Sequence, residues 1–198
     1  MIQARWKFLV SLSLLLAMSF TGALCADTAP PPPQGPHIIM IIRHAEKPDE
    51  SDDGVKDPNL SPVGYQRADA LAKVIPAHFP MPDFLIAAKL SKHSNRPVET
   101  ITPLSKAIKE SIDSTFDAKD VAGVSHFLLT DPKFAGKTIL IAWHHEKIPE
   151  LAKDLGVTNA PSDWNSDVYD RVWEITYTNG VPAWQNLPES ALPGDSTK

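Results

Sequence analysis

The segment from Ile38 to Pro48 has the sequence IIMIIRHAEKP. Its first five residues are all large and apolar, which predicts a strand that is buried on both faces. Arg43, His44 and Lys47 follow, so a histidine stands beside two cations where that strand ends. This setting is typical of a histidine that handles phosphate, although a strand-end histidine with one structural hydrogen bond has the same local sequence. The rest of the chain must decide between these two interpretations.

The N-terminal residues have the pattern of a secretory signal peptide over 1–26. Arg5 and Lys7 precede the apolar stretch 8–18, and small residues follow around 22–26. A membrane anchor is the alternative, but the stretch is interrupted by serines and is short for a spanning helix. Cys25 leaves lipid attachment open as a minor alternative. We therefore expect an exported protein, periplasmic or secreted, that is not stably inserted in the membrane after cleavage.

Cleavage after residue 26 would change both the redox chemistry and the charge of the chain. Cys25 is the only cysteine, so the mature chain could form no disulfide. Loss of Arg5 and Lys7 lowers the count of basic residues from 19 to 17 against 24 acidic ones, and the formal charge moves from −5 to −7. An acidic exported protein is a poor candidate for binding nucleic acid. Any anion site must be a local concentration of cations.

The remaining 172 residues are enough for one core domain with tails. Five prolines within 29–36 predict an extended linker over 27–36, a domain over 37–188 and a flexible tail over 189–198. Strands and helices are expected to alternate, which favours a single three-layer α/β/α domain around a mostly parallel sheet. The expected strands are 37–43, 83–88, 138–143, 171–178 and 181–184, and Asn179-Gly180 predicts a hairpin between the last two. The expected helices are 62–75, ended by Pro76, 95–110, bent or broken at Pro103, 118–129, and one that carries Ile148, Leu151 and Leu155.

Four motifs follow one another along this domain. They are Arg43-His44-Ala45, the sequence LSPVGYQRA over 60–68, Ser94-Asn95-Arg96 with Glu99-Thr100, and ILIAWHHE over 139–146. In type and order they resemble the motifs of the histidine phosphatase superfamily, also called the phosphoglycerate mutase-like or RHG family. The similarity spans roughly 38–177, which is most of the mature chain. Four motifs in order are a much more specific signal than any one of them.

The resemblance implies a phosphoglycerate mutase-like fold and a role for several residues. His44 would attack phosphorus and form a phosphohistidine, while Arg43 and Arg96 would bind the phosphate. Two positions depart from the common pattern. Ala45 replaces the usual glycine, and Lys47 stands where phosphatase members often carry an arginine, so it keeps the charge but loses the bidentate fork. A phosphate contact and a solvated loop lysine remain equal alternatives for Lys47.

The last motif contains two adjacent histidines, and neighbouring strand residues point to opposite faces. We expect His145, rather than His144, to face the site, because His145-Glu146 resembles the His-Asp pair of the acid phosphatase and phytase branch. Glu146 would then protonate the leaving alcohol. A glutamate in the first turn of a helix is also favourable for structural reasons alone, so this role stays open. His145 to Pro149 lacks the second histidine of a zincin, which argues against a metal site.

These observations favour an exported, metal-independent phosphomonoesterase that needs no cofactor. Its substrate would be a phosphorylated small molecule or an envelope-associated phosphoester, for example a phosphorylated glycan or protein. A phosphate-binding member of the same fold that has lost turnover is the alternative from a different functional class. The oligomeric state does not follow from the sequence.

Overall fold

The computed structural model describes residues 35–48 and 57–196, and within them the chain forms one six-stranded mixed sheet. The strand order is β3-β2-β4-β1-β5-β6. The pairings β1–β4, β4–β2 and β2–β3 are parallel, whereas β5 pairs antiparallel with both β1 and β6. The strands are β1 (Ile38–Arg43), β2 (Phe84–Ala87), β3 (Ile112–Asp113), β4 (Thr138–Trp143), β5 (Arg171–Thr178) and β6 (Val181–Pro188).

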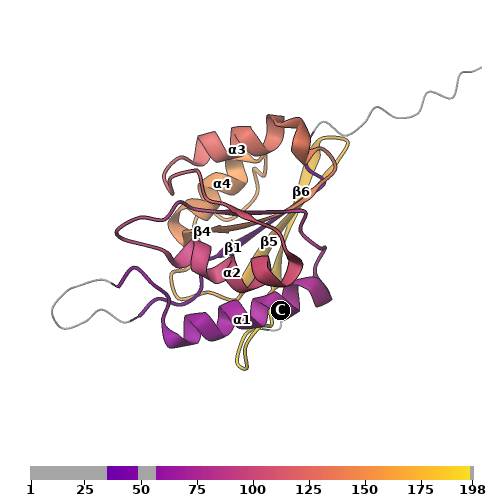
Figure 1. The fold of residues 1–198 in the computed structure, drawn as a ribbon. Coiled ribbons are helices and arrows are strands. Elements are labelled where there is room, and N and C mark those ends of the chain that lie inside the picture. The colour runs from indigo at the N-terminus through magenta and orange to yellow at the C-terminus, as the bar shows by residue number, and fades with distance from the viewer. Residues whose placement is uncertain (1–34, 49–56, 197–198) are drawn as a thin grey trace, which may run out of the picture. The chain divides into compact units, whose positions relative to one another are not determined.

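The helices cover both faces of this sheet (Figure 1). They are α1 (Pro62–His78), α2 (Arg96–Ile108), α3 (Val121–Thr130) and α4 (Ile148–Asp154), with short 3-10 turns η1 (Pro132–Phe134) and η2 (His145–Lys147). One buried cluster joins the face of Ile39 and Ile41 to residues of α3 and α4. A second cluster joins the opposite face, with Met40 and Ile42, to residues of α1 and α2. The three-layer α/β fold is therefore confirmed.

The two most apolar strands lie side by side at the centre of the sheet. β1 and β4 pair residue for residue, from Ile38 with Thr138 to Arg43 with Trp143. Both strands are buried after their first residue, because helices cover both faces of the sheet at this point. The exits of β1 and β4 consequently meet at the same edge of the sheet.

Local sequence signals account for most element boundaries. Ser61 caps α1 by accepting a hydrogen bond from the Gly64 amide at 3.0 Å. Asn179 and Gly180, both at positive φ, form the predicted hairpin between β5 and β6. Two prolines were expected to interrupt helices, but α1 continues through Pro76 to His78 and α2 is continuous through Pro103. β3 was not predicted, because two residues are too few for a periodic pattern.

The C-terminal residues differ from the expected flexible tail. Residues 189–196, called the C-terminal segment below, pack against the domain, and Glu189 is only 1% exposed. The amide of Glu189 donates to the Asp170 carbonyl at 2.8 Å, and Asp195 accepts from two amides of its own segment. The sequence signal failed because this segment of mostly small and polar residues packs through polar bonds rather than through an apolar stripe.

Some expectations fall on other parts of the chain. The signal peptide and nearly all of the linker lie outside the described residues, so export stays a prediction. Within the described ranges, no helix has the length and apolar character needed to cross a membrane.

Candidate functional site

The site is built where β1 and β4 end. Beyond the last ladder pair, the His44 amide donates to the Trp143 carbonyl at 2.9 Å, which continues the pairing by one residue. Ile42 and Ala142 are paired and face the same side of the sheet. Because successive strand residues alternate between the two faces, His44 and His144, each two residues further on, point to that side as well. Their rings meet edge to face with centroids 5.2 Å apart. Two histidines from strands one hundred residues apart thus lie together.

The ring beside His44 is that of His144, not that of His145 as expected. His145 begins the η2 turn, and its Nδ1 lies 3.1 Å from Glu146 Oε2 without the alignment of a hydrogen bond. The prediction rested on the resemblance of His145-Glu146 to a family motif. It did not use the register of β1 and β4, which brings His144, not His145, level with His44. His145 still lines the neighbouring pocket, so the structure gives the two histidines different places at one site.

His44 is held in one protonation state and one tautomer. It is 3% exposed, and its Nδ1 lies 2.7 Å from the Ala45 carbonyl oxygen. Because a carbonyl only accepts, Nδ1 carries the proton and Nε2 keeps its lone pair. Burial lowers the pKa of His44 well below its ordinary value of 6.5, and the charges of Arg96 and Arg43 act in the same direction. A neutral ring with a free Nε2 is the form that acts as a nucleophile.

Arg43 is fixed by the loop that precedes β5. Its Nη1 donates to the carbonyls of Ser166 and Val168, the latter at 3.1 Å, and its guanidinium lies 3.7 Å above the Tyr169 ring. Burial lowers the pKa of Arg43, but an arginine stays cationic at neutral pH. Its Nε is buried and has no hydrogen-bond partner within the described residues. The guanidinium is therefore held in one place, next in sequence to His44.

Arg96 approaches from the start of α2 with a similar arrangement. Its Nη1 donates to the Asp57 carbonyl at 3.0 Å, whereas its Nε is buried without a partner in the described part of the chain. The charge of Arg96 lowers the pKa of both His44 and His144. Two fixed cations near a neutral histidine form a set that suits the oxygens of a phosphate.

Lys47 and Glu146 lie at the open side of the site. Lys47 lines a pocket of about 500 Å³ together with Arg43, His145 and Tyr169. The Glu146 side chain is 60% exposed, and its charge raises the pKa of His144 against the larger lowering effect of burial. The structure therefore brings all six predicted site residues to one region, although it does not test their roles.

Sequence reasoning missed several residues that support the site. The Thr100 hydroxyl accepts from the Ala45 amide at 2.8 Å and donates to the Arg96 carbonyl at 2.7 Å, so it links the β1 exit to α2. Thr100 stood within a quoted motif and was available to inspection. Tyr169 and the carbonyls of Ser166 and Val168 carried no signal, because irregular loops have no periodicity.

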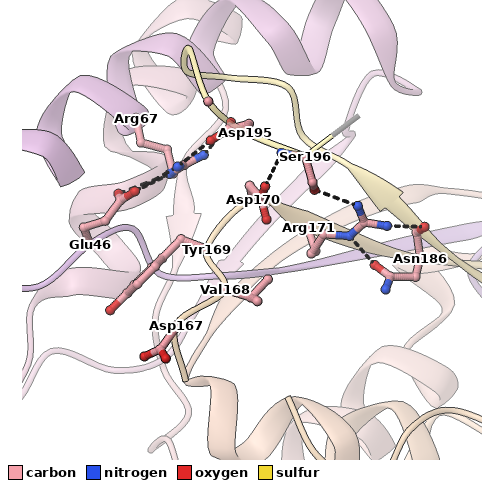
Figure 2. A pocket seen from close by; sticks show the side chains of 11 residues that line it. Glu46, Arg67, Asp167, Val168, Tyr169, Asp170, Arg171, Asn186, Asp195 and Ser196 are labelled. Atoms are coloured by element: carbon pink, nitrogen blue, oxygen red, sulfur yellow. Dashed lines mark hydrogen bonds and ion pairs between the residues drawn. The ribbon is translucent and has the colours of Figure 1, made fainter. Parts of the chain in front are cut away.

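A second pocket of about 590 Å³ shares Glu46, Asp167 and Tyr169 with the first. Figure 2 shows that Arg67 lies between Glu46 and Asp195 on one side of it, while Arg171 contacts Asn186 and Ser196 on the other. The space beside Arg43 thus extends along the C-terminal segment. Within the described ranges, no group of three or more His, Cys, Asp or Glu side chains is placed to hold a metal ion, and the absence of a metal from the reaction stays a prediction.

Comparison with known proteins places this architecture among solved structures. No protein-family model and no curated protein sequence matches the chain. Phosphoglycerate mutase from Bacillus anthracis matches with a TM-score of 0.53 at 13% identity, covering 80% of this chain and 96% of its own. The protein histidine phosphatase SixA, solved with tungstate, matches with a TM-score of 0.54 at 14% identity, covering 77% of this chain and 97% of its own.

The chain has the fold of the phosphoglycerate mutase-like histidine phosphatases. A mycobacterial glucosyl-3-phosphoglycerate phosphatase, solved with inorganic phosphate, also matches, with a TM-score of 0.52 at 13% identity over 76% of this chain and 95% of its own. The resemblance inferred from the four motifs is therefore confirmed at the level of fold. At such low identity the activity must be argued from the side chains of this chain itself.

Proposed function

We propose that the protein is an exported, metal-independent phosphomonoesterase that works through a phosphohistidine on His44. One observation carries this proposal. The buried His44 ring donates from Nδ1 to the Ala45 carbonyl, and burial together with the charges of Arg96 and Arg43 lowers its pKa. A fixed nucleophile with cationic donors around it is what transfer of a phosphoryl group requires.

The reaction would take place in two displacements. In the first, the Nε2 lone pair forms a bond to phosphorus while the bond from phosphorus to the ester oxygen breaks. Arg43, Arg96 and His144 donate to the three equatorial oxygens, where negative charge accumulates. In the second, water attacks phosphorus and the P–N bond breaks, which releases phosphate and restores the neutral ring. Lys47 contributes charge from the edge of the pocket.

Glu146 is the proposed acid for the first displacement. Its carboxyl group would give its proton to the leaving alkoxide and then accept a proton from the attacking water. Its influence on the pKa values of His144 and His145 supports this role, because it places the carboxylate beside both rings. His145, 3.1 Å from Glu146, would hold that carboxylate in place. The exposure of Glu146 lets it reach leaving groups of different shapes.

The substrate class follows from location and chemistry together. A chain exported by the predicted signal peptide would meet phosphorylated small molecules or phosphoesters of the cell envelope, not cytoplasmic signalling partners. The neighbouring fold members named above act on small phosphoesters or on a protein histidine phosphate, so both sizes of substrate are compatible with this fold. A phosphorylated envelope glycan or protein is the second candidate substrate.

The test compares the chain from Asp27 with its His44→Ala variant in para-nitrophenyl phosphate hydrolysis with EDTA present. His126→Ala, an exposed histidine of α3, is the matched control. Loss of activity in His44→Ala alone, with radioactive phosphate trapped on the wild-type chain, would support the proposal. Equal activity in all three proteins would exclude His44 as the nucleophile.

A member of the fold that binds phosphate without turnover is the remaining alternative, which the open position of Glu146 favours. In that case the wild-type chain binds inorganic phosphate or tungstate in calorimetry, but no phosphoenzyme forms with any phosphomonoester.

A further inference from the structure

We propose that the C-terminal segment is part of the apparatus that positions His44, and that it acts through Arg67 and Glu46. This inference goes beyond the proposed activity, because it concerns the geometry of His44 in the absence of substrate. It rests on a chain of contacts that joins the end of the domain to the β1 exit.

Arg67 is the centre of this chain of contacts. It is 5% exposed, and its guanidinium is surrounded by three carboxylates that come from different parts of the sequence. Its Nε and Nη2 donate to Glu46 at 2.8 to 3.1 Å, its Nη1 and Nη2 donate to Asp195 at 2.9 Å, and Nη1 donates to Glu189 at 3.2 Å. Figure 2 shows Arg67 directed toward Glu46 on one side and Asp195 on the other. Both ends of its planar fork are therefore occupied.

The contacts continue from Glu46 to His44 through one peptide group. The Ala45 carbonyl that fixes the His44 tautomer belongs to the peptide between Ala45 and Glu46. The Ala45 amide is held by Thr100, and the Glu46 carbonyl accepts from the Ser61 amide at 2.9 Å. The side chain of Glu46 is held only by Arg67 in the described structure. Release of Arg67 would thus remove the one side-chain restraint on this peptide.

The C-terminal segment holds Arg67 from the other side. Asp195 Oδ2 accepts from the amides of Ala191 and Leu192 at 2.8 and 2.9 Å, so the segment folds around its own carboxylate. The Ser196 amide donates to Asp170 Oδ2 at 2.6 Å. Asp170 follows Tyr169, whose ring lies beneath the Arg43 guanidinium. The segment therefore contacts Arg67, which is bonded to Glu46 near His44, and Asp170, which is next to the tyrosine that lies under Arg43.

The charges of this cluster also argue for positioning. Burial lowers the pKa of Arg67, but its bonds to Asp195 and Glu46 outweigh that effect and raise it. Glu189 Oε1 is buried without a partner among the described residues. A buried ionic cluster with an unsatisfied oxygen stabilises a fold little compared with apolar packing, and its best-attested use is to specify one arrangement. Here the specified arrangement includes the peptide that orients His44.

The test measures the His44 ring by ¹⁵N NMR in the full mature chain without substrate, and then kcat/KM for para-nitrophenyl phosphate. Asp195→Asn removes the charge that holds Arg67. Its expected result is a mixture of the two neutral His44 tautomers and a fall in kcat/KM of roughly tenfold to a hundredfold, as for other residues that orient a reacting group. Asp195→Glu restores the carboxylate and should recover part of both signals.

The matched control is Asp120→Ala, which removes the N-cap of α3 on the other side of the sheet. It should lower the melting temperature but leave the His44 tautomer and kcat/KM unchanged. If Asp195→Asn does not fold, Ser196→Pro offers a milder change, because it removes the exposed amide that bonds to Asp170 and the hydroxyl that accepts from Arg171 but keeps the Asp195 carboxylate. It should shift both signals in the same direction by a smaller amount.

A single Nδ1–H tautomer and wild-type kcat/KM in a folded Asp195 or Ser196 variant would overturn the inference. The NMR signal keeps this outcome separate from the proposed function. If the wild-type chain hydrolyses no phosphoester, the proposed activity fails, whereas the effect of Asp195 on the His44 tautomer still decides the positioning role.

Discussion

The exits of β1 and β4 have nearly the same sequence but different surroundings. His44-Ala45-Glu46-Lys47 follows the first strand, and His144-His145-Glu146-Lys147 follows the second, in register with it. The first exit is held by Thr100, Ser61 and Arg67. The second turns directly into η2, where its residues are partly exposed. Similar residues are therefore held in place at the first exit and left partly exposed at the second, because different elements pack around them.

The two glutamates show this difference most directly. The side chain of Glu46 is 19% exposed and paired with Arg67, whereas that of Glu146 is 60% exposed. A buried, paired carboxylate can hold a backbone in place, and an exposed one is free to exchange protons. Under the proposed function, the first exit supplies the rigid nucleophile and the second supplies the groups that serve the leaving alcohol.

The two adjacent histidines of the second exit should differ strongly in their effect on activity, and His144→Ala should have the larger one. His144→Ala takes away a proposed donor next to His44, and kcat should fall about 10² to 10³-fold, as for loss of a transition-state donor. His145→Ala should lower kcat by less than about tenfold, because its ring lies against Glu146 rather than His44. Steady-state kinetics with para-nitrophenyl phosphate measures both. The reverse order of effects would restore His145 as the histidine that contacts the phosphoryl group.

Glu146→Gln and Glu46→Gln should differ in how their effect on the rate depends on the leaving group of the substrate. Hydrolysis of an alkyl phosphate, whose alkoxide needs a proton, should slow about 10²-fold, since general acids contribute that much. For para-nitrophenyl phosphate, whose leaving group needs no proton, kcat/KM should stay near the wild-type value, because it reports the first displacement and not the later attack of water. Glu46→Gln should instead slow both substrates alike, because it loosens the β1 exit. Equal losses on both substrates in Glu146→Gln would remove its role as the acid.

Gly64→Ala tests how tightly the first exit is packed. A Cβ at this position would clash with the Glu46 carbonyl oxygen and lie 3.1 Å from the Glu46 amide nitrogen. Because these are backbone atoms, the structure must shift, and the free energy of unfolding should fall by about 1 to 3 kcal/mol. Urea denaturation measures this change. Gly123→Ala, which meets only the flexible Asp120 carboxylate, is the control with an expected smaller loss.

The smallest effect concerns the pH dependence of stability, which should arise at the first exit. Burial raises the pKa of Glu189 well above its ordinary value of 4.5, while Arg67 opposes this and Asp195 and Glu46 add to it. A carboxyl with a raised pKa stabilises the fold fully below 4.5, and this contribution is lost as pH rises through the folded-state value. The free energy of unfolding, relative to that of Glu189→Gln, should therefore fall with rising pH.

Urea denaturation between pH 4 and pH 8 measures the free energy of unfolding of the wild type and of Glu189→Gln. The lowered pKa of His44 should make stability rise with pH in both proteins, so this contribution cancels in their difference. Parallel curves for wild type and Glu189→Gln would show that Glu189 titrates alike in the folded and unfolded chain.

The sequence predicted those parts of the fold that depend on local or periodic signals. Continuous apolar runs identified β1 and β4, and Asn179-Gly180 identified the hairpin. Pro76 and Pro103 were given too much weight. A proline at position 76 lacks only the bond to the Ala72 carbonyl, and α1 ends two residues later in any case.

The residues of the candidate site also differ in whether a local sequence signal identifies them. Arg43, His44 and Arg96 came from motifs, because each lies within a few residues of a strand end or a helix start. The place of His144 required the register of two strands far apart in sequence. The contacts of Arg67 with Asp195 and of Arg43 with Val168 join residues more than 120 positions apart, and no local pattern encodes such pairs. The sequence alone therefore located the motif residues better than the contacts that support them.

The bond between Arg67 and Asp195 also sets an order of events during biosynthesis. A ribosome makes His44, Arg67 and Arg96 early, but the guanidinium of Arg67 cannot be neutralised by Asp195 until residue 195 has been made. Until then Glu46 is the carboxylate that can pair with Arg67, and the ion cluster around Arg67 is completed only when the C-terminal segment has been made. A C-terminal fusion joined close to residue 196 would act on this closing step before it acted on any other part of the fold.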